Sequence, residues 1–232
     1  MFIANYNLKS AVQKSMMLLR LPVDFAVLHP YRALQERALR ETMDFIVAEM
    51  PEAVAFNTPK ELMAHALKGI AKTGLVAEFG VNSGGSINFL AGRLPKRTIH
   101  GFDSFEGLPE DWSGNQMAAG FFSRKGRMPK VAANVTLHRG WFCDTLPKFA
   151  AENDEPVALL HVDCDIYSST VTIFEHLGSR LVPGSLVLFD EYFNYPAWQM
   201  HEHKAFREFL ARSGRHCSYI AYSYSQVLCV MR

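Results

Sequence analysis

Acidic side chains follow two apolar runs in the second half of the chain, at the point where each run ends. Asp163 comes after residues 157–162, and Asp190 and Glu191 come after residues 185–189. If both runs are neighbouring strands, their tips lie roughly 5 Å apart. Three carboxylates at that spacing repel one another, and a divalent cation removes the repulsion. The pattern therefore predicts a Mg²⁺ site formed by Asp163, Asp190 and Glu191, because Mg²⁺ prefers oxygen ligands.

A Mg²⁺ ion at this place would serve an oxygen nucleophile, because it lowers the pKa of an alcohol or phenol and fixes its direction. The proton of that hydroxyl would pass to Asp163 or to water. His201 and His203 follow soon after Glu191 and are alternative catalytic bases, although a histidine there also fits a helix surface. Asp165, together with two nearby serines, is expected to cap the next helix instead.

A glycine-rich turn follows an earlier apolar run. Gly80 to Ser86 read G-x-x-x-G-G-S, whereas turns that bind dinucleotides read G-x-G-x-x-G. Glu78, just before the turn, can accept an ammonium group. Asp103, a little over twenty residues past Gly80, ends a second run and can accept the hydroxyls of a ribose. Acids and glycines also occur in ordinary turns, but this register favours an amino acid joined to a nucleoside, S-adenosylmethionine (SAM).

The elements that must position these side chains alternate between strand and helix from residue 75 onward. Strands are predicted at residues 75–79, 98–103, 135–138, 157–162, 185–189, 216–221 and 226–231. Helices are predicted between them at residues 86–94, 146–152, 169–181 and 201–213. Such alternation gives a parallel sheet with helices on both faces. The last two strands are too close in sequence for a crossover, so they should form a hairpin and make one strand antiparallel.

The first part of the chain reads as a helical extension. Residues 31–50 carry good helix formers, and Thr58-Pro59-Lys60-Glu61 has the residues of a helix start. We expect an N-terminal helical extension over residues 1–73 and a catalytic domain over residues 74–232. The apolar run at residues 16–21 could cover the mouth of the site or a second copy of the chain, or simply pack in the core. A homodimer is one expectation from this extension.

Residues 107–134 lack periodicity and combine basic side chains with aromatic ones. A segment of this length in a compact domain is usually functional or disordered. One interpretation is a lid over the substrate, with aromatic side chains against an apolar acceptor. The other is a solvated basic loop. Binding to nucleic acid is a weaker third, because the basic cluster is short.

Composition indicates an ordinary soluble globular protein, and the length fits one large α/β domain. Of the 232 residues, 49% are hydrophobic and 20% are charged, and the net charge is +1. This balance argues against nucleic acid or an acidic membrane as the partner. The four cysteines include no C-x-x-C pair, which favours free thiols in a reducing compartment. We found no membrane-spanning run and no signal peptide pattern, so we expect a cytoplasmic protein.

Four motifs together resemble class I SAM-dependent methyltransferases of the macrocin O-methyltransferase type. They are Glu78-Phe79-Gly80-Val81-Asn82-Ser83-Gly84-Gly85-Ser86, Phe102-Asp103-Ser104-Phe105-Glu106-Gly107-Leu108-Pro109, Gly140-Trp141-Phe142 with Asp144-Thr145-Leu146-Pro147, and Val162-Asp163-Cys164-Asp165-Ile166-Tyr167-Ser168-Ser169-Thr170. The resemblance covers about residues 57–212. The second motif is the more specific one.

The resemblance implies a Rossmann-like seven-stranded sheet in the order 3-2-1-4-5-7-6. It also implies a magnesium ion and methylation of a hydroxyl on a sugar or another natural product. The cofactor would contact Glu78, Gly80 and Gly84 through its methionine part, Asp103 through its ribose, and Ser104 and Phe142 through its adenine. Further cofactor-binding residues would be Asn82, Ser83, Ser86 and Asp163. Many members of the family have Asp-Asp where this chain has Asp190-Glu191.

Three other functions remain open at this stage. A metal-independent N- or O-methyltransferase would use His201 or His203 as its base and would keep its activity in EDTA. A non-catalytic SAM-binding scaffold would bind SAM without turnover. A dehydrogenase that uses a nicotinamide cofactor is the third, and the spacing of the glycines argues against it.

Overall fold

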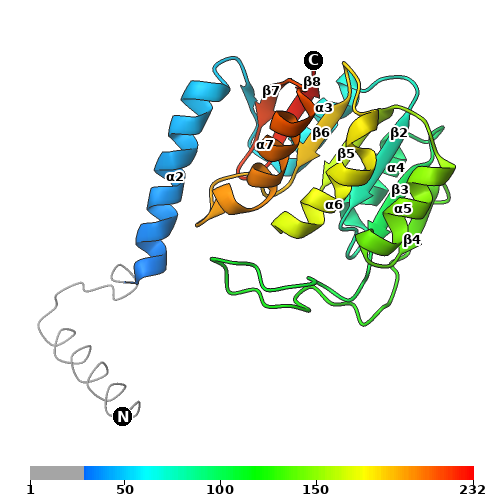
Figure 1. The fold of residues 1–232 in the computed structure, drawn as a ribbon, viewed down its shortest axis with the longest axis horizontal. Helices are drawn as coiled ribbons and strands as arrows, with labels where there is room; N and C mark the ends of the chain where they lie inside the picture. The colour runs from blue at the N-terminus through cyan, green and yellow to red at the C-terminus, as the bar shows by residue number, and fades with distance from the viewer. Residues whose placement is uncertain (1–28) are drawn as a thin grey trace, which may run out of the picture.

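In the computed structural model, residues 29–232 form one mixed sheet with helices on both faces (Figure 1). The strands are β1 (Val54–Ala55), β2 (Leu75–Phe79), β3 (Ile99–Asp103), β4 (Val135–Arg139), β5 (Val157–Val162), β6 (Leu186–Phe189), β7 (Cys217–Tyr222) and β8 (Val227–Met231). The helices are α2 (Pro30–Glu49), α3 (Pro59–Gly69), α4 (Gly85–Arg93), α5 (Phe142–Glu152), α6 (Tyr167–Leu177) and α7 (Glu202–Ser213). Short 3₁₀ helices lie at η2 (Gly178–Arg180) and η3 (Trp198–Met200).

The order of the strands confirms the predicted topology and adds one strand. The sheet runs β1-β7-β8-β6-β5-β2-β3-β4. Without β1, and read from β4, this is the order 3-2-1-4-5-7-6. Only β8 runs antiparallel to its neighbours, β6 and β7, because residues 223–226 are too short for a crossover. The addition is β1, which lies in the expected helical extension and pairs in parallel with β7.

Each face of the sheet has its own apolar core. Helices α5, α6 and α7 cover one face, which Figure 1 shows toward the viewer, and α3 and α4 cover the other. The central strands β2, β5 and β6 are buried over their whole length, as expected for parallel strands covered on both sides. This burial fixes where the carboxyl ends of the three strands emerge.

A local sequence signal explains the start of α3, whereas α5 begins earlier than predicted. Thr58 and Glu61 form the predicted capping box of α3, with Pro59 in the first turn. Helix α5 begins at Phe142 rather than at the expected residue 146, because the carbonyl of Trp141 accepts hydrogen bonds from the N–H groups of Asp144 and Thr145. Pro147 thus lies in the second turn of the helix, whereas the predicted start placed it in the first turn.

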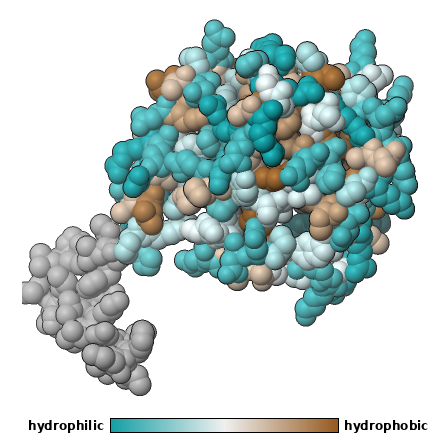
Figure 2. Space-filling view, in the orientation of Figure 1, coloured by the Kyte–Doolittle hydropathy of each residue, from teal (hydrophilic) through white to brown (hydrophobic). Residues whose placement is uncertain are grey.

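Helix α2 packs on the apolar core between the sheet and α5, α6 and α7, but only through part of its surface. It leaves Leu34, Leu39, Met43 and Val47 exposed. On the face seen in Figure 2, hydrophobic residues form small separate patches on a largely hydrophilic surface. The homodimer stays a prediction, and the expectation for residues 16–21 lies outside the described residues. None of the helices of residues 29–232 has the length and hydropathy that a membrane span requires.

Candidate active site

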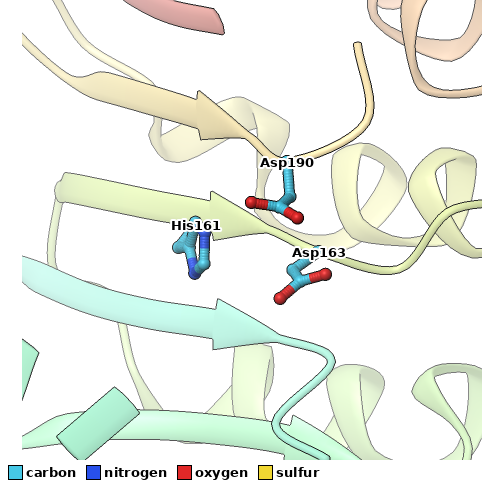
Figure 3. A group of neighbouring side chains, drawn as sticks. All are labelled: His161, Asp163 and Asp190. Atoms are coloured by element: carbon cyan, nitrogen blue, oxygen red, sulfur yellow. The ribbon is translucent and has the colours of Figure 1, made fainter. Parts of the chain in front are cut away.

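The tips of β2, β5 and β6 meet at one edge of the sheet. Phe79 pairs with Val162, and Val162 pairs with Phe189, so the residues that follow these three positions emerge side by side. Figure 3 shows the side chains of Asp163 and Asp190 close together at neighbouring strand tips, with His161 further back on β5. The convergence that the sequence predicted for these acids is therefore present.

Gly80 is required where the turn after β2 crosses the end of β5. Its φ is +92°, and a Cβ built on it would lie 1.7 Å from the backbone carbonyl oxygen of Asp163. No side chain larger than hydrogen fits there without moving the backbone. Gly80 therefore sets the close approach between the glycine-rich turn and the acidic strand tip.

Asp103 holds the same turn from the other side. One of its carboxylate oxygens accepts hydrogen bonds from the N–H groups of Val81 at 2.8 Å and Asn82 at 2.7 Å. The other oxygen accepts one bond from the N–H of Phe105 at 2.6 Å. That second oxygen keeps a free lone pair, so Asp103 can still accept a hydroxyl from a ligand.

Glu78 lies beneath the turn and has internal partners. Its side chain is fully buried, and its two oxygens contact the hydroxyl of Ser86 and Nδ1 of His161, each at 2.9 Å. Burial lowers the pKa of His161, but the hydrogen bond and the charge of Glu78 outweigh it, so the pKa is raised overall. Glu78 thus braces β2 against β5 and α4, which differs from the direct contact with an ammonium group that the sequence suggested.

The acidic side chains form two overlapping groups that share Asp163. In one group, ligand atoms of His161, Asp163 and Asp190 lie within 4.8 Å of one another. In the other group, Asp163, Asp165 and Glu191 meet the same limit. The predicted trio of Asp163, Asp190 and Glu191 is thus divided between two groups, and Asp165 is an additional candidate ligand.

Asp165 does not cap the next helix, contrary to the sequence-based expectation. The N-cap residue of α6 is Ile166, and no side chain caps that end. Asp165 has a φ of +66° and is buried, so its carboxylate turns toward Asp163 and Glu191. The one local signal for this conformation is that Asp tolerates the left-handed region better than most residues.

Burial and mutual repulsion raise the pKa of three carboxyl groups in this cluster. Burial, with the charge of Asp190 and other nearby acids, raises the pKa of Asp163 well above its usual range. The same causes raise the pKa of Glu191 and bring that of Asp165 to about 7. One oxygen of Glu191 is buried without any hydrogen-bond partner. A set of oxygen ligands with excess negative charge and an unpaired oxygen fits a divalent cation such as Mg²⁺.

A cavity of about 480 Å³ connects this acidic cluster with Asp103. Its lining includes the predicted residues Gly80, Asn82, Asp103, Ser104, Phe142, Asp163, Asp190 and Glu191. It also includes Asp165, which was expected to cap a helix, Phe122 and Arg124 of residues 107–134, and Trp141 and Cys143. Glu78, Ser83, Gly84 and Ser86 belong to the turn and its support and do not line the cavity. One continuous space thus joins the site expected for a nucleoside to the cluster of acids.

The two histidines considered as bases lie elsewhere. His203 packs edge-on against the rings of Phe45 and Trp198 between α7 and α2. Burial lowers its pKa to about 4, with a smaller effect from the charge of Arg207. Nε2 of His201 contacts the carbonyl oxygen of Ser113 at 2.9 Å and so links the start of α7 to residues 107–134. Neither histidine lines the cavity.

Residues 107–134 are anchored by a small apolar cluster of their own. Leu108 and Trp112 pack on Ile166, the N-cap residue of α6. The ring centroids of Trp112 and Tyr195 lie 5.6 Å apart. Figure 1 shows the segment running along the lower edge of the molecule, across the ends of the strands. Phe122 and Arg124 of this segment line the cavity. The segment therefore forms a wall of the site, as the lid interpretation requires.

A family model described as a methyltransferase domain matches residues 77–192. The chain belongs to this family of methyltransferase domains. The matched range begins inside β2 and ends just after Glu191, so it contains the glycine-rich turn, Asp103 and the acidic cluster.

Two curated relatives are named as O-methyltransferases. Over 141 residues, the chain is 32% identical to the 8-demethyl-8-(2,3-dimethoxy-alpha-L-rhamnosyl)-tetracenomycin-C 4'-O-methyltransferase of Streptomyces olivaceus, which covers 51% of this chain and 53% of that protein. Over 157 residues, it is 27% identical to the mycinamicin III 3''-O-methyltransferase of Micromonospora griseorubida, covering 56% and 61%. The chain thus spans between half and two thirds of these relatives.

Solved structures of methyltransferases share the fold. The calicheamicin methyltransferase CalS11 superposes with a TM-score of 0.62 at 22% identity, over 86% of this chain and 91% of that one. The O-methyltransferase NovP superposes with a TM-score of 0.59 at 22% identity, over 75% and 78%. These similarities confirm the Rossmann-like methyltransferase fold that the sequence predicted.

Proposed function

We propose that this protein is a SAM-dependent, Mg²⁺-dependent O-methyltransferase that acts on a hydroxyl of a small molecule, either a sugar or another natural product. The observation that carries the proposal is the single cavity that joins Asp103 to the cluster around Asp163. The curated relatives support the reaction class, because both are named as O-methyltransferases.

In this proposal, the cofactor lies along the glycine-rich turn and β3. Asp103 accepts a ribose hydroxyl with its less occupied oxygen, and Ser104 and Phe142 bound the adenine. Gly80 and Asn82 line the cavity beside the acidic cluster, where the methionine part would lie. SAM supplies an electrophilic methyl group on a sulfonium. Glu78 contributes indirectly by bracing the turn through Ser86 and His161.

The acceptor hydroxyl would meet the methyl group at the acidic strand tips. Asp163, Asp190 and Glu191 would hold Mg²⁺, with Asp165 as a further ligand. When bound, Mg²⁺ offsets the negative charge of these side chains and lowers the pKa of an approaching hydroxyl. Asp163 belongs to both acidic groups and is placed to take the proton. The walls of the cavity fix the angle of attack, which contributes much of the rate.

The metal-independent alternative loses support from the geometry. A metal-independent enzyme would need His201 or His203 as its base, and neither lines the cavity. His203 also lies in an aromatic environment that disfavours its protonated form. We therefore assign His203 a packing role in this proposal.

The test combines a labelled cofactor with a matched pair of variants. The protein, Mg²⁺ and SAM with a labelled methyl group are incubated with a library of hydroxylated metabolites, and labelled products are identified by mass spectrometry. Asp163→Ala should lower labelling by about 10³-fold or more while the affinity for S-adenosylhomocysteine (SAH) stays within a few fold. The control Asp154→Ala removes an exposed carboxylate after α5 and should keep full labelling.

Two results would contradict the proposal. Labelling that persists unchanged in EDTA would remove the role of the metal. Failure of the wild-type protein to bind SAM or SAH in calorimetry would remove the methyltransferase assignment itself.

A further inference from the structure

Glu202 is a buried carboxylate that the proposed mechanism does not use. It is the first residue of α7, and its side chain has no exposed surface. It does not line the cavity. A buried acid needs hydrogen-bond partners, so the partners of Glu202 indicate what it does.

Its two oxygens bind the backbone of two separate loops. Oε1 accepts hydrogen bonds from the N–H groups of Cys164 at 3.4 Å and Asp165 at 3.3 Å, in the loop after β5. Oε2 accepts one from the N–H of Glu191 at 3.3 Å, in the loop after β6. One side chain on α7 therefore connects the two loops that carry the acidic cluster.

This connection begins where the sheet stops. The last paired residues of β5 and β6 are Val162 and Phe189, and one further bond runs from the N–H of Asp190 to the carbonyl of Val162 at 2.9 Å. Beyond that point, Glu202 connects the loop after β5 with the loop after β6. It also contacts the N–H of Asp165, whose φ of +66° turns the side chain toward Asp163 and Glu191.

We propose that Glu202 is a positioning residue, which holds the loops after β5 and β6 at the spacing that a divalent cation requires. The inference rests on the metal site of the proposed function. Glu202 does not touch the cavity, so it acts through the backbone of Asp165 and Glu191 rather than on the substrate or the ion. Loss of such supporting contacts typically weakens metal binding by 10- to 100-fold.

A carboxylate is required for this arrangement, and the amide variant tests it. All three partners are N–H donors, and both oxygens of Glu202 accept from them. Glutamine has nearly the same shape but offers only one oxygen, so its NH₂ group would face an N–H donor. Glu202→Gln should therefore release one of the two loops with little change in side-chain volume.

The experiment measures the affinity for Mn²⁺, used in place of Mg²⁺, by the loss of the electron paramagnetic resonance signal of the free ion. Glu202→Gln should bind Mn²⁺ about 10- to 100-fold more weakly than the wild type. Calorimetry should give an affinity for SAH within about twofold of the wild type, because the cofactor side of the cavity is held by Gly80 and Asp103. The control Glu208→Gln alters another glutamate of α7, which accepts a bond from the hydroxyl of Tyr167, and should keep Mn²⁺ affinity.

A second variant keeps the test decisive if Glu202→Gln does not fold. Glu202→Asp retains both oxygens but moves them back by one methylene group, so it should also weaken Mn²⁺ binding and leave SAH binding nearly unchanged. Wild-type Mn²⁺ affinity in whichever variant folds would overturn the role of Glu202. An equal loss of Mn²⁺ and SAH affinity would overturn it too, because that indicates a general structural role. If the wild type binds SAH but no Mn²⁺, the metal part of the proposed function fails, and the role of Glu202 fails with it.

Discussion

At the scale of single residues, the site depends on a backbone contact as much as on acidic side chains. Gly80 lets the turn after β2 touch the carbonyl of Asp163, so the cofactor side and the acidic side of the cavity share one fixed point. The same small residue serves both halves of the proposed site. A substitution of Gly80 therefore tests the geometry of the site more directly than a substitution of any of the acids.

Replacing Gly80 by alanine should destabilise the protein by on the order of 3 kcal/mol, because the added Cβ would overlap the carbonyl of Asp163 at a positive φ. Urea denaturation provides the free energy of unfolding. The control Gly85→Ala adds a Cβ at the start of α4, where no atom lies within 4 Å, and should change stability by less than about 1 kcal/mol. Equal stability of the two variants would contradict the close contact.

At the scale of elements, the packing of α7 on α2 determines the pKa of His203. The pKa of His203 falls from its usual 6.5 to about 4, chiefly through burial, so the folded state binds fewer protons than the unfolded state between these values. The resulting stability is complete above about pH 6.5 and is lost as the pH falls through 4.

His203→Phe removes this titration and should flatten the pH dependence of stability. Between about pH 7.5 and pH 5, the wild type should lose about 2 kcal/mol of unfolding free energy through His203, and the variant should not lose that share. Urea titrations at both pH values measure it. The exposed His216, replaced by asparagine, serves as the control. A variant with the full acid sensitivity of the wild type would show that His203 is not the titrating group.

The wall formed by residues 107–134 should depend on its small apolar cluster. Trp112→Ala removes the ring that packs on Ile166 and Tyr195, so the segment should open more often. Trypsin should then cut after Arg124 or Arg127 about tenfold faster than in the wild type, since local opening governs cleavage. Phe121→Ala, which changes a ring that is 46% exposed on the same segment, should keep the wild-type rate. Unchanged cleavage in Trp112→Ala would argue that the segment is held by other contacts.

The sequence was informative where short-range patterns decide the structure. Apolar runs that end in acids located the strand tips, and the alternation of elements predicted a mostly parallel sheet, whereas the order of its strands was implied only by the resemblance to known methyltransferases. Asp165 was expected to cap a helix, because neither its left-handed backbone nor its hydrogen bond to Glu202, which lies on a helix far along the chain, is visible in the local sequence. Likewise, β1 is two residues long and exists through its pairing with β7, so its own sequence carries no strand signal.

At the scale of the whole molecule, the acidic cluster links stability to pH and to metal. The pKa of Asp165 is raised to about 7, and those of Asp163 and Glu191 are raised as well, by burial and mutual charge. The metal-free folded state therefore holds protons that the unfolded chain has released. The contribution of these three carboxyl groups to the free energy of unfolding should therefore fall as the pH rises from about 4 through 7, opposite in sign to the contribution of His203.

Mg²⁺ should reverse this trend, because it binds the ionised carboxylates. The rise in melting temperature on adding Mg²⁺ should be larger at about pH 8 than at about pH 6, where protons compete for the same oxygens. Differential scanning fluorimetry with Mg²⁺ and with EDTA measures it, and Asp163→Ala should reduce the difference between the two pH values. A Mg²⁺ effect that is the same at both pH values would argue against binding at this cluster.

The short strand β1 has a consequence for solubility. It covers part of the outer edge of β7, whose backbone would otherwise offer unpaired N–H and C=O groups to another molecule. Unprotected edges of this kind are templates for aggregation. A shortened protein that begins after Ala55 should therefore self-associate into insoluble material, even though it keeps the glycine-rich turn, Asp103 and the acidic cluster.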